Sequence, residues 1–117
     1  MRVVEAFDDS DNSDKKLFLY LAYQAVHAPS EVPARYRDAY NATIEDTHRR
    51  TFAGMLSCMD EGIGNVTSAL KAKGLLDESL IIFTTDNGGP TPKTPGGDYV
   101  GSRNYPPVGF LQSIVSD

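Results

Sequence analysis

The sequence predicts an α/β fold built on one strand–helix–strand (βαβ) unit of a larger, mainly parallel sheet. Two apolar runs of strand length, residues 17–23 and 80–85, flank a segment over 47–73 in which apolar residues recur every three or four positions. Strands that are buried on both faces have continuous apolar sequences, and a helix usually connects parallel strands. We therefore expect the two strands to point the same way.

The composition limits the classes of function open to this chain. Its 117 residues suit one domain, and its formal net charge is -5 with no basic block interleaved with aromatic residues, so nucleic acid is not expected as a partner. The single cysteine, Cys58, excludes an internal disulfide and is expected to be a buried thiol. We expect no transmembrane segment, because a run of about 18 apolar residues is lacking, and no signal peptide, because residues 1–14 are too polar.

Residues 1–14 are expected to form a polar leader. Their run of Asp, Asn and Ser from Asp8 onward is typical of a solvated linker. Asp8 and Asp9 could also be paired metal ligands, but nothing nearby in the sequence would hold them rigid. The linker is therefore the simpler interpretation.

The first predicted strand, residues 17–23, leads to a histidine. His27 lies just beyond the carboxyl end of this strand, and Pro29 and Pro33 are expected to keep the next segment extended and to prevent a helix. A histidine in a proline-rich loop is usually an ordinary loop residue. The position also suits a catalytic histidine, and both interpretations stay open at this point.

Two Asn-x-Thr triplets are candidate glycosylation sites. They begin at Asn41 and Asn65, and neither has proline in its middle position. Such triplets also arise by chance, but either one could carry a glycan in the secretory pathway.

The segment over 47–73 has the clearest helical period in the chain. One face is predicted to be buried, and its residues are Phe52, Met55, Met59, Ile63, Val66 and Leu70. Asp46 or Thr47 is the expected N-cap. Lys71 and Lys73 suit the negative end of the helix dipole, and Gly74 suits the position after the helix.

The second predicted strand, residues 80–85, runs directly into Asp86 and Asn87 and then into two glycines. This sequence is also a common turn, because all three residue types favour turns. Ligands of open α/β sheets collect beyond the carboxyl ends of strands, and the βαβ unit places His27 at the same edge as Asp86 and Asn87. Carboxylate and amide oxygens at that edge favour a hard cation such as Ca²⁺ or Mg²⁺ over zinc.

One βαβ unit leaves much of its apolar surface uncovered. Two strands alone are marginal in water, and one amphipathic helix covers only one of their faces. A Ca²⁺ ion takes about 6–8 oxygen ligands, whereas this edge supplies two clear donors. We therefore expect a piece of a larger α/β domain, with a leader over 1–14, a partial domain over 15–106 and a divergent tail over 107–117.

Six stretches of the chain share their order and approximate spacing with one family of enzymes. They are residues 17–22, 24–29, 53–55, 59–61, 64–67 and 83–89. Together they resemble the type I sulfatases of the alkaline-phosphatase-like superfamily, most closely the arylsulfatase B-like branch. The resemblance implies a partial sulfatase fold.

The resemblance also implies roles for three residues. Asp86 matches a carboxylate ligand of the active-site Ca²⁺, and Asn87 matches its amide-oxygen neighbour. His27 matches a residue that contacts the sulfate ester and is a candidate proton donor to the leaving oxygen. The implied activity is hydrolysis of sulfuric esters, either aryl sulfates or sulfated carbohydrates such as glycosaminoglycan sugars, in a lysosomal or secreted protein.

The chain departs from the sulfatase pattern at the nucleophile. The family makes a formylglycine from the cysteine of a Cys-x-Pro-Ser-Arg motif, and Cys58 does not match this motif. The family's Leu-Arg-Gly-x-Lys stretch is also missing after residue 106. We therefore expect an internal fragment that is inactive alone. The alternatives are a non-catalytic secreted glycoprotein or interaction module, and a Ca²⁺-binding domain.

Overall fold

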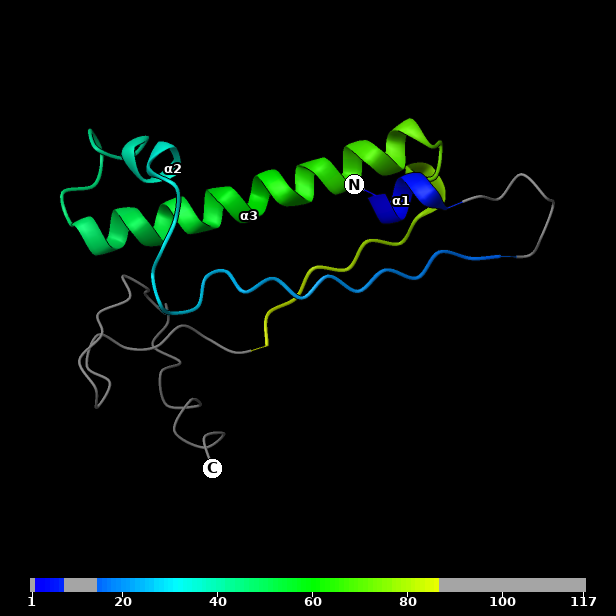
Figure 1. Cartoon of the computed structure of the whole chain (residues 1–117), viewed down its shortest axis with the longest axis horizontal. Coiled ribbons are helices and arrows are strands. Elements are labelled where there is room, and N and C mark those ends of the chain that lie inside the picture. Colours follow the sequence, from blue (N-terminus) through cyan, green and yellow to red (C-terminus); the bar gives the residue numbers. More distant parts are fainter. Residues whose placement is uncertain (1, 8–14, 87–117) are drawn as a thin grey trace, which may run out of the picture.

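The computed structural model describes residues 2–7 and 15–86 of the chain. This part contains helices α1 (Arg2–Ala6), α2 (Ala34–Asp38) and α3 (Thr47–Ala72) and a short 3₁₀ turn, η1 (Leu76–Glu78). Helix α3 is the longest element, and α1, α2 and η1 all contact it (Figure 1). The described part of the chain is therefore organised around one helix.

Helix α3 confirms the helix predicted over 47–73. Asp46 is its N-cap, because the Asp46 Oδ1 atom accepts a hydrogen bond of 2.7 Å from the backbone N–H of Arg49. Gly74 follows the helix with a φ of 70°, which a residue with a side chain rarely adopts. Local capping chemistry thus determines both ends of α3.

The apolar face of α3 is only partly covered. Met55 and Leu70 are buried, with 6% and 7% of their surface exposed. The other predicted members of this face are half-buried, and they are Phe52, Met59, Ile63 and Val66. The predicted face is therefore correct, but the described part of the chain does not cover it completely.

Helix α1 was not predicted from the sequence, which indicated only a polar leader. Val4 of α1 is fully buried, and α1 packs on α3. The Lys73 Nζ atom donates a hydrogen bond of 3.2 Å to the backbone oxygen of Phe7, which ties the end of this turn to the end of α3. Residues 8–14, including the Asp8–Asp9 pair, lie outside the described residues.

Helix α2 shows that one prediction was wrong, since Pro33 does not prevent a helix. Pro33 is the N-cap residue and α2 starts immediately after it. Proline is well tolerated at a helix start, where its missing N–H would have no partner within the helix. Just after α2, the Tyr40 hydroxyl forms a hydrogen bond of 2.6 Å with the Ser57 hydroxyl of α3.

Gly54 allows α2 to approach α3 closely. A methyl group at this position would lie 2.9 Å from the backbone nitrogen of Arg37 and 3.0 Å from the carbonyl carbon of Tyr36. We expect Gly54→Ala to destabilise the fold by about 1–3 kcal/mol, because backbone atoms of α2 must move. Urea denaturation followed by circular dichroism measures this change.

Gly64 supplies the matched control on the same helix. A methyl group there would meet nothing within 4 Å. We expect Gly64→Ala to stabilise the fold by about 0.5–1 kcal/mol through helix propensity alone. If Gly54→Ala and Gly64→Ala changed the free energy of unfolding equally, α2 would not pack on Gly54 as described.

The two predicted strands are extended but form no sheet among the described residues. Residues 15–23 and 79–86 run in the same direction along one side of α3 (Figure 1), which agrees with the chain direction of a βαβ unit. No backbone hydrogen bond joins 16–23 to 80–84. A ladder requires paired backbone groups on a neighbouring strand, and two strands alone are marginal. The α/β prediction is therefore not reproduced as strands in this part of the chain.

The prediction that these segments are buried on both faces was also wrong. In the first segment, Leu17 and Leu19 are half-buried, whereas the alternate residues Phe18 and Tyr20 are 90% and 80% exposed. Successive side chains of an extended chain point to opposite faces, so this alternation indicates that only one face of the segment is covered. Tyr23 lies against α3, because its hydroxyl is 2.9 Å from the position of a Cβ atom at Gly62.

Candidate functional site

His27 lies in the turn that follows the first extended segment. Its backbone N–H donates a hydrogen bond of 3.0 Å to the backbone oxygen of Gln24, and its side chain is exposed. The Nδ1 atom lies 2.6 Å from the backbone oxygen of Ala28. A carbonyl oxygen can only accept, so Nδ1 carries the proton of this bond, and Nε2 is the ring nitrogen that takes no part in it.

Asp86 ends the second extended segment with its side chain exposed. Asn87 lies outside the described residues. The two extended segments run in one direction and end toward the same side of the molecule (Figure 1). This arrangement suits a site that uses both segment ends, although a contact between the His27 and Asp86 side chains stays a prediction.

The described residues do not form a complete metal site. No group of three or more His, Cys, Asp or Glu side chains that could hold a metal ion occurs among them. Asp86 offers an exposed carboxylate, which is the right type of donor for Ca²⁺ but supplies only part of the shell of about 6–8 oxygens. Further donors would have to come from other residues.

Cys58 does not match the sequence of the family's nucleophile. It lies within α3 and has no Cys-x-Pro-Ser-Arg sequence around it. Its side chain is half-buried rather than fully buried as predicted, because α3 is only partly covered.

A polar cluster between α2 and α3 was not predicted from the sequence. The Arg35 guanidinium donates a hydrogen bond of 2.6 Å to the Tyr36 hydroxyl and lies 3.6 Å from the Glu61 carboxylate. The hydrogen bond from Arg35 favours the tyrosinate, but hydrogen bonds with Glu61 and Cys58 together with desolvation outweigh it, so the pKa of Tyr36 is raised. The charged side chains of Arg35 and Glu61 are both largely exposed, so this cluster contributes little to stability.

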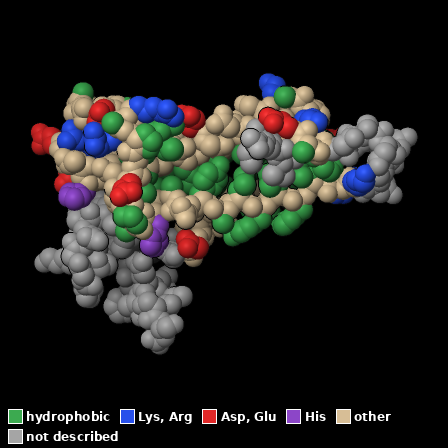
Figure 2. All heavy atoms as spheres, viewed as in Figure 1, with side chains coloured by type: hydrophobic (Ala, Val, Ile, Leu, Met, Phe, Trp, Pro, Cys, Tyr) green, Lys and Arg blue, Asp and Glu red, His purple; other side chains and the backbone are tan. Residues whose placement is uncertain are grey.

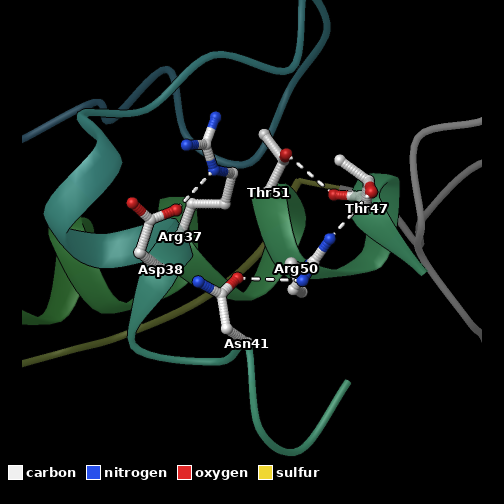
Figure 3. Close-up of polar contacts among 6 residues, drawn as sticks. All are labelled: Arg37, Asp38, Asn41, Thr47, Arg50 and Thr51. Carbon is white, nitrogen blue, oxygen red and sulfur yellow. Dashed lines mark hydrogen bonds and ion pairs between the residues drawn. The ribbon is translucent and has the colours of Figure 1, made fainter. Parts of the chain in front are cut away.

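The two candidate glycosylation sites have different surroundings. The Asn41 Oδ1 atom accepts a hydrogen bond of 2.8 Å from Arg50, whose other terminal nitrogen donates to the Thr47 hydroxyl at 2.9 Å (Figure 3). This contact uses the amide oxygen and not the nitrogen to which a glycan is attached. Asn65 is exposed on α3. Both asparagines therefore lie at the surface.

Among the described helices, none combines the length and the apolarity needed to cross a bilayer.

Comparisons with known proteins point to one family. The chain is 55% identical over 75 residues to mouse Arylsulfatase J, a match that covers 64% of this chain and 12% of that protein. It is 34% identical over 105 residues to the uncharacterized sulfatase YdeN of Escherichia coli, which covers 85% of the chain and 18% of YdeN. It is 32% identical over 80 residues to human Arylsulfatase A, which covers 68% of the chain and 14% of that enzyme.

The chain thus spans less than a fifth of the length of these relatives. No solved structure matches it. The family model described as Sulfatase matches residues 1–107, which is nearly the whole chain. These matches agree with the motifs identified in the sequence, and the chain belongs to the sulfatase family.

Proposed function

We propose that this chain supplies one part of the sulfate-ester site of a sulfatase, and that its 117 residues alone do not turn over substrate. The match of the family model over residues 1–107 carries this proposal. The exposed side chains of His27 and Asp86 at the ends of two parallel extended segments support it further.

The proposed chemistry assigns His27 to the leaving group. In hydrolysis of a sulfuric ester, the bond between sulfur and the bridging oxygen breaks, and this oxygen departs with the electron pair. A proton delivered from Nε2 of His27 neutralises it, while the hydrogen bond from Nδ1 to Ala28 holds the ring. His27 is therefore the residue of this chain that we assign to proton transfer.

Asp86 and Asn87 are proposed to hold a Ca²⁺ ion. Bound there, the ion would supply positive charge to the sulfate group. The motifs of this chain supply only part of the ligand shell of the ion. They also supply no formylglycine nucleophile, because Cys58 has no Cys-x-Pro-Ser-Arg sequence around it. Without a nucleophile only binding and electrostatic effects remain, so we expect the chain to be inactive.

The substrates and location follow from the arylsulfatase B-like resemblance. We propose aryl sulfates or sulfated glycosaminoglycan sugars as substrates of the site, in a lysosomal or secreted protein. The names of Arylsulfatase J and Arylsulfatase A among the relatives support the aryl sulfate assignment.

A chimera tests the proposed function directly. Residues 15–89 of this chain replace the matching segment of mouse Arylsulfatase J, which retains the rest of the enzyme. We expect turnover of an aryl sulfate by the chimera and none by the 117-residue chain alone. A chimera that folds cooperatively but is inactive would favour the non-catalytic module, and turnover by the chain alone would contradict the fragment proposal.

We also propose that Asn41 and Asn65 carry glycans. The chain is fused to a secretory signal peptide and expressed in animal cells, and peptide N-glycosidase treatment should then increase its electrophoretic mobility. Asn41→Gln and Asn65→Gln should each remove one step of the shift. Asn12→Gln is the control, because Asn12 is followed two residues later by Asp14 and not by Ser or Thr. A mobility that the enzyme treatment leaves unchanged would contradict this proposal.

A further inference from the structure

His27 lies on a loop, residues 24–33, that is attached to α3 on both sides. Immediately before the loop, the Tyr23 hydroxyl lies 2.9 Å from the position of a Cβ atom at Gly62. Immediately after it, α2 packs on α3 at Gly54. Figure 1 shows the chain leading from the end of the first extended segment to α2, which lies at the N-terminal part of α3. The loop is therefore held by contacts at two glycines of α3.

The two contacts differ in how easily they give way. At Gly62 the atoms nearest to an added Cβ all belong to the Tyr23 ring, which can rotate away. At Gly54 they are backbone atoms of Tyr36 and Arg37 at 2.9–3.1 Å, whereas ordinary contacts are 3.4–4 Å. The backbone of α2 would have to move by at least about 0.5 Å to admit a methyl group. The contact at Gly54 is therefore the rigid one.

The connection between His27 and α2 is short and stiff. Five residues separate His27 from Pro33, the N-cap residue of α2. Pro29 and Pro33 each fix φ near about -65° and also restrict the residue that precedes them. On the other side of His27, its backbone N–H closes a turn with the Gln24 oxygen at 3.0 Å. A displacement of α2 is therefore passed on to His27 rather than absorbed between them.

We propose that Gly54 is a positioning residue for His27. Without a side chain at Gly54, α2 lies close to α3, and the stiff connection then holds the imidazole ring at its place in the site. The inference rests on the proposed role of His27 in proton transfer to the leaving oxygen. Misplacing a reacting group by about 1 Å can lower a rate about 10²-fold, so a displacement of about half that size has a measurable effect.

The first test is Gly54→Ala in the chimera with mouse Arylsulfatase J. We expect kcat for a sulfated sugar to fall about 10–100-fold. The loss should be smaller for nitrophenyl sulfate, because a nitrophenol leaves readily without a proton from His27. A loss of folded enzyme would instead lower both rates equally. Gly64→Ala is the matched control and should change neither rate, because a methyl group there meets nothing within 4 Å.

A second variant changes the connection and leaves the contact at Gly54 intact. Two glycines inserted after Ser30 should lower kcat for the sulfated sugar about 10–100-fold, with the free energy of unfolding close to that of the parent chimera. Adding Gly54→Ala to this insertion should lower kcat by less than about 2-fold more, because α2 then no longer holds His27. Independent effects of the two changes would multiply.

The 117-residue chain allows a test that does not depend on activity. His27 and His48 are its two histidines, and both side chains are exposed (purple in Figure 2). Labelling with ¹⁵N-histidine therefore gives two backbone amide signals in a nuclear magnetic resonance spectrum, which His48→Gln assigns. We expect Gly54→Ala to move the His27 signal and Gly64→Ala to leave it in place.

The outcomes separate this proposal from the proposed function. Equal losses of kcat on the two substrates in Gly54→Ala would overturn the positioning role, and so would an unchanged His27 signal with α3 intact by circular dichroism. If Gly54→Ala prevents folding, an insertion after Ser30 that leaves kcat unchanged would overturn it. If His27→Ala left kcat unchanged while Gly54→Ala moved the His27 signal, proton transfer by His27 would be wrong and its positioning by Gly54 would stand.

Discussion

Replacing His27 by alanine in the chimera with mouse Arylsulfatase J is expected to lower kcat by about 10²–10⁴-fold, the usual contribution of a general acid. The loss should depend on the leaving group. A nitrophenol leaves readily without a proton, so its sulfate ester should be affected least. A sugar hydroxyl leaves poorly as an alkoxide, so a sulfated sugar should be affected most. Turnover of both substrates by parent and variant chimeras measures this difference.

His48 provides the control, since it is the second of the two histidines of the chain and lies in the first turn of α3. His48→Ala in the same chimera should leave kcat unchanged. An equal loss on both substrates in His27→Ala would contradict proton donation and would leave His27 a positioning role only. No loss on either substrate would remove His27 from the site.

Asp86→Ala in the chimera is expected to weaken Ca²⁺ binding by at least about 10–100-fold. Loss of even an indirect partner of a metal ligand has effects of that size, and Asp86 is proposed to bind the ion directly. Titration calorimetry on the chimera, first stripped of metal, gives the affinity. Activity should fall in parallel at low Ca²⁺.

Two further variants make the test specific. Asp86→Asn keeps an oxygen donor and loses the charge, so excess Ca²⁺ should restore part of its activity, whereas Asp86→Ala should recover less. Asp77→Ala removes an exposed carboxylate of η1, at the other end of the second segment, and should leave the affinity unchanged. If Asp86→Ala bound Ca²⁺ as tightly as the parent chimera, the proposed metal site would be wrong.

The short helices show where sequence reasoning failed. Helices α1 and α2 each contain five residues, which is too short for an apolar period and too short to be stable in isolation. They form because Val4 is buried against α3 and because Gly54 leaves room for the backbone of α2. Neither contact has a signal in the local sequence.

The sequence proposes the residues of the candidate site but not their arrangement. The positions of His27 and Asp86 after two apolar runs indicated a shared edge, and the matching stretches indicated the family. The hydrogen bond from His27 to Ala28 and the exposure of both side chains required the three-dimensional structure. The cluster of Arg35, Tyr36 and Glu61 joins two helices through residues that look like ordinary surface positions in the sequence.

Helix α3, its capping by Asp46 and its end at Gly74 could all be predicted from the amino-acid sequence, because helix hydrogen bonds and caps connect residues at most a few positions apart. The sequence also predicted that residues 17–23 and 80–85 are extended. The three-dimensional structure was needed to show that no backbone hydrogen bond joins residues 17–23 to residues 80–84 and that Phe18 and Leu80 are exposed. A strand needs hydrogen bonds from a neighbouring strand that is often far away in the sequence, so its pairing and burial depend on which neighbours are present.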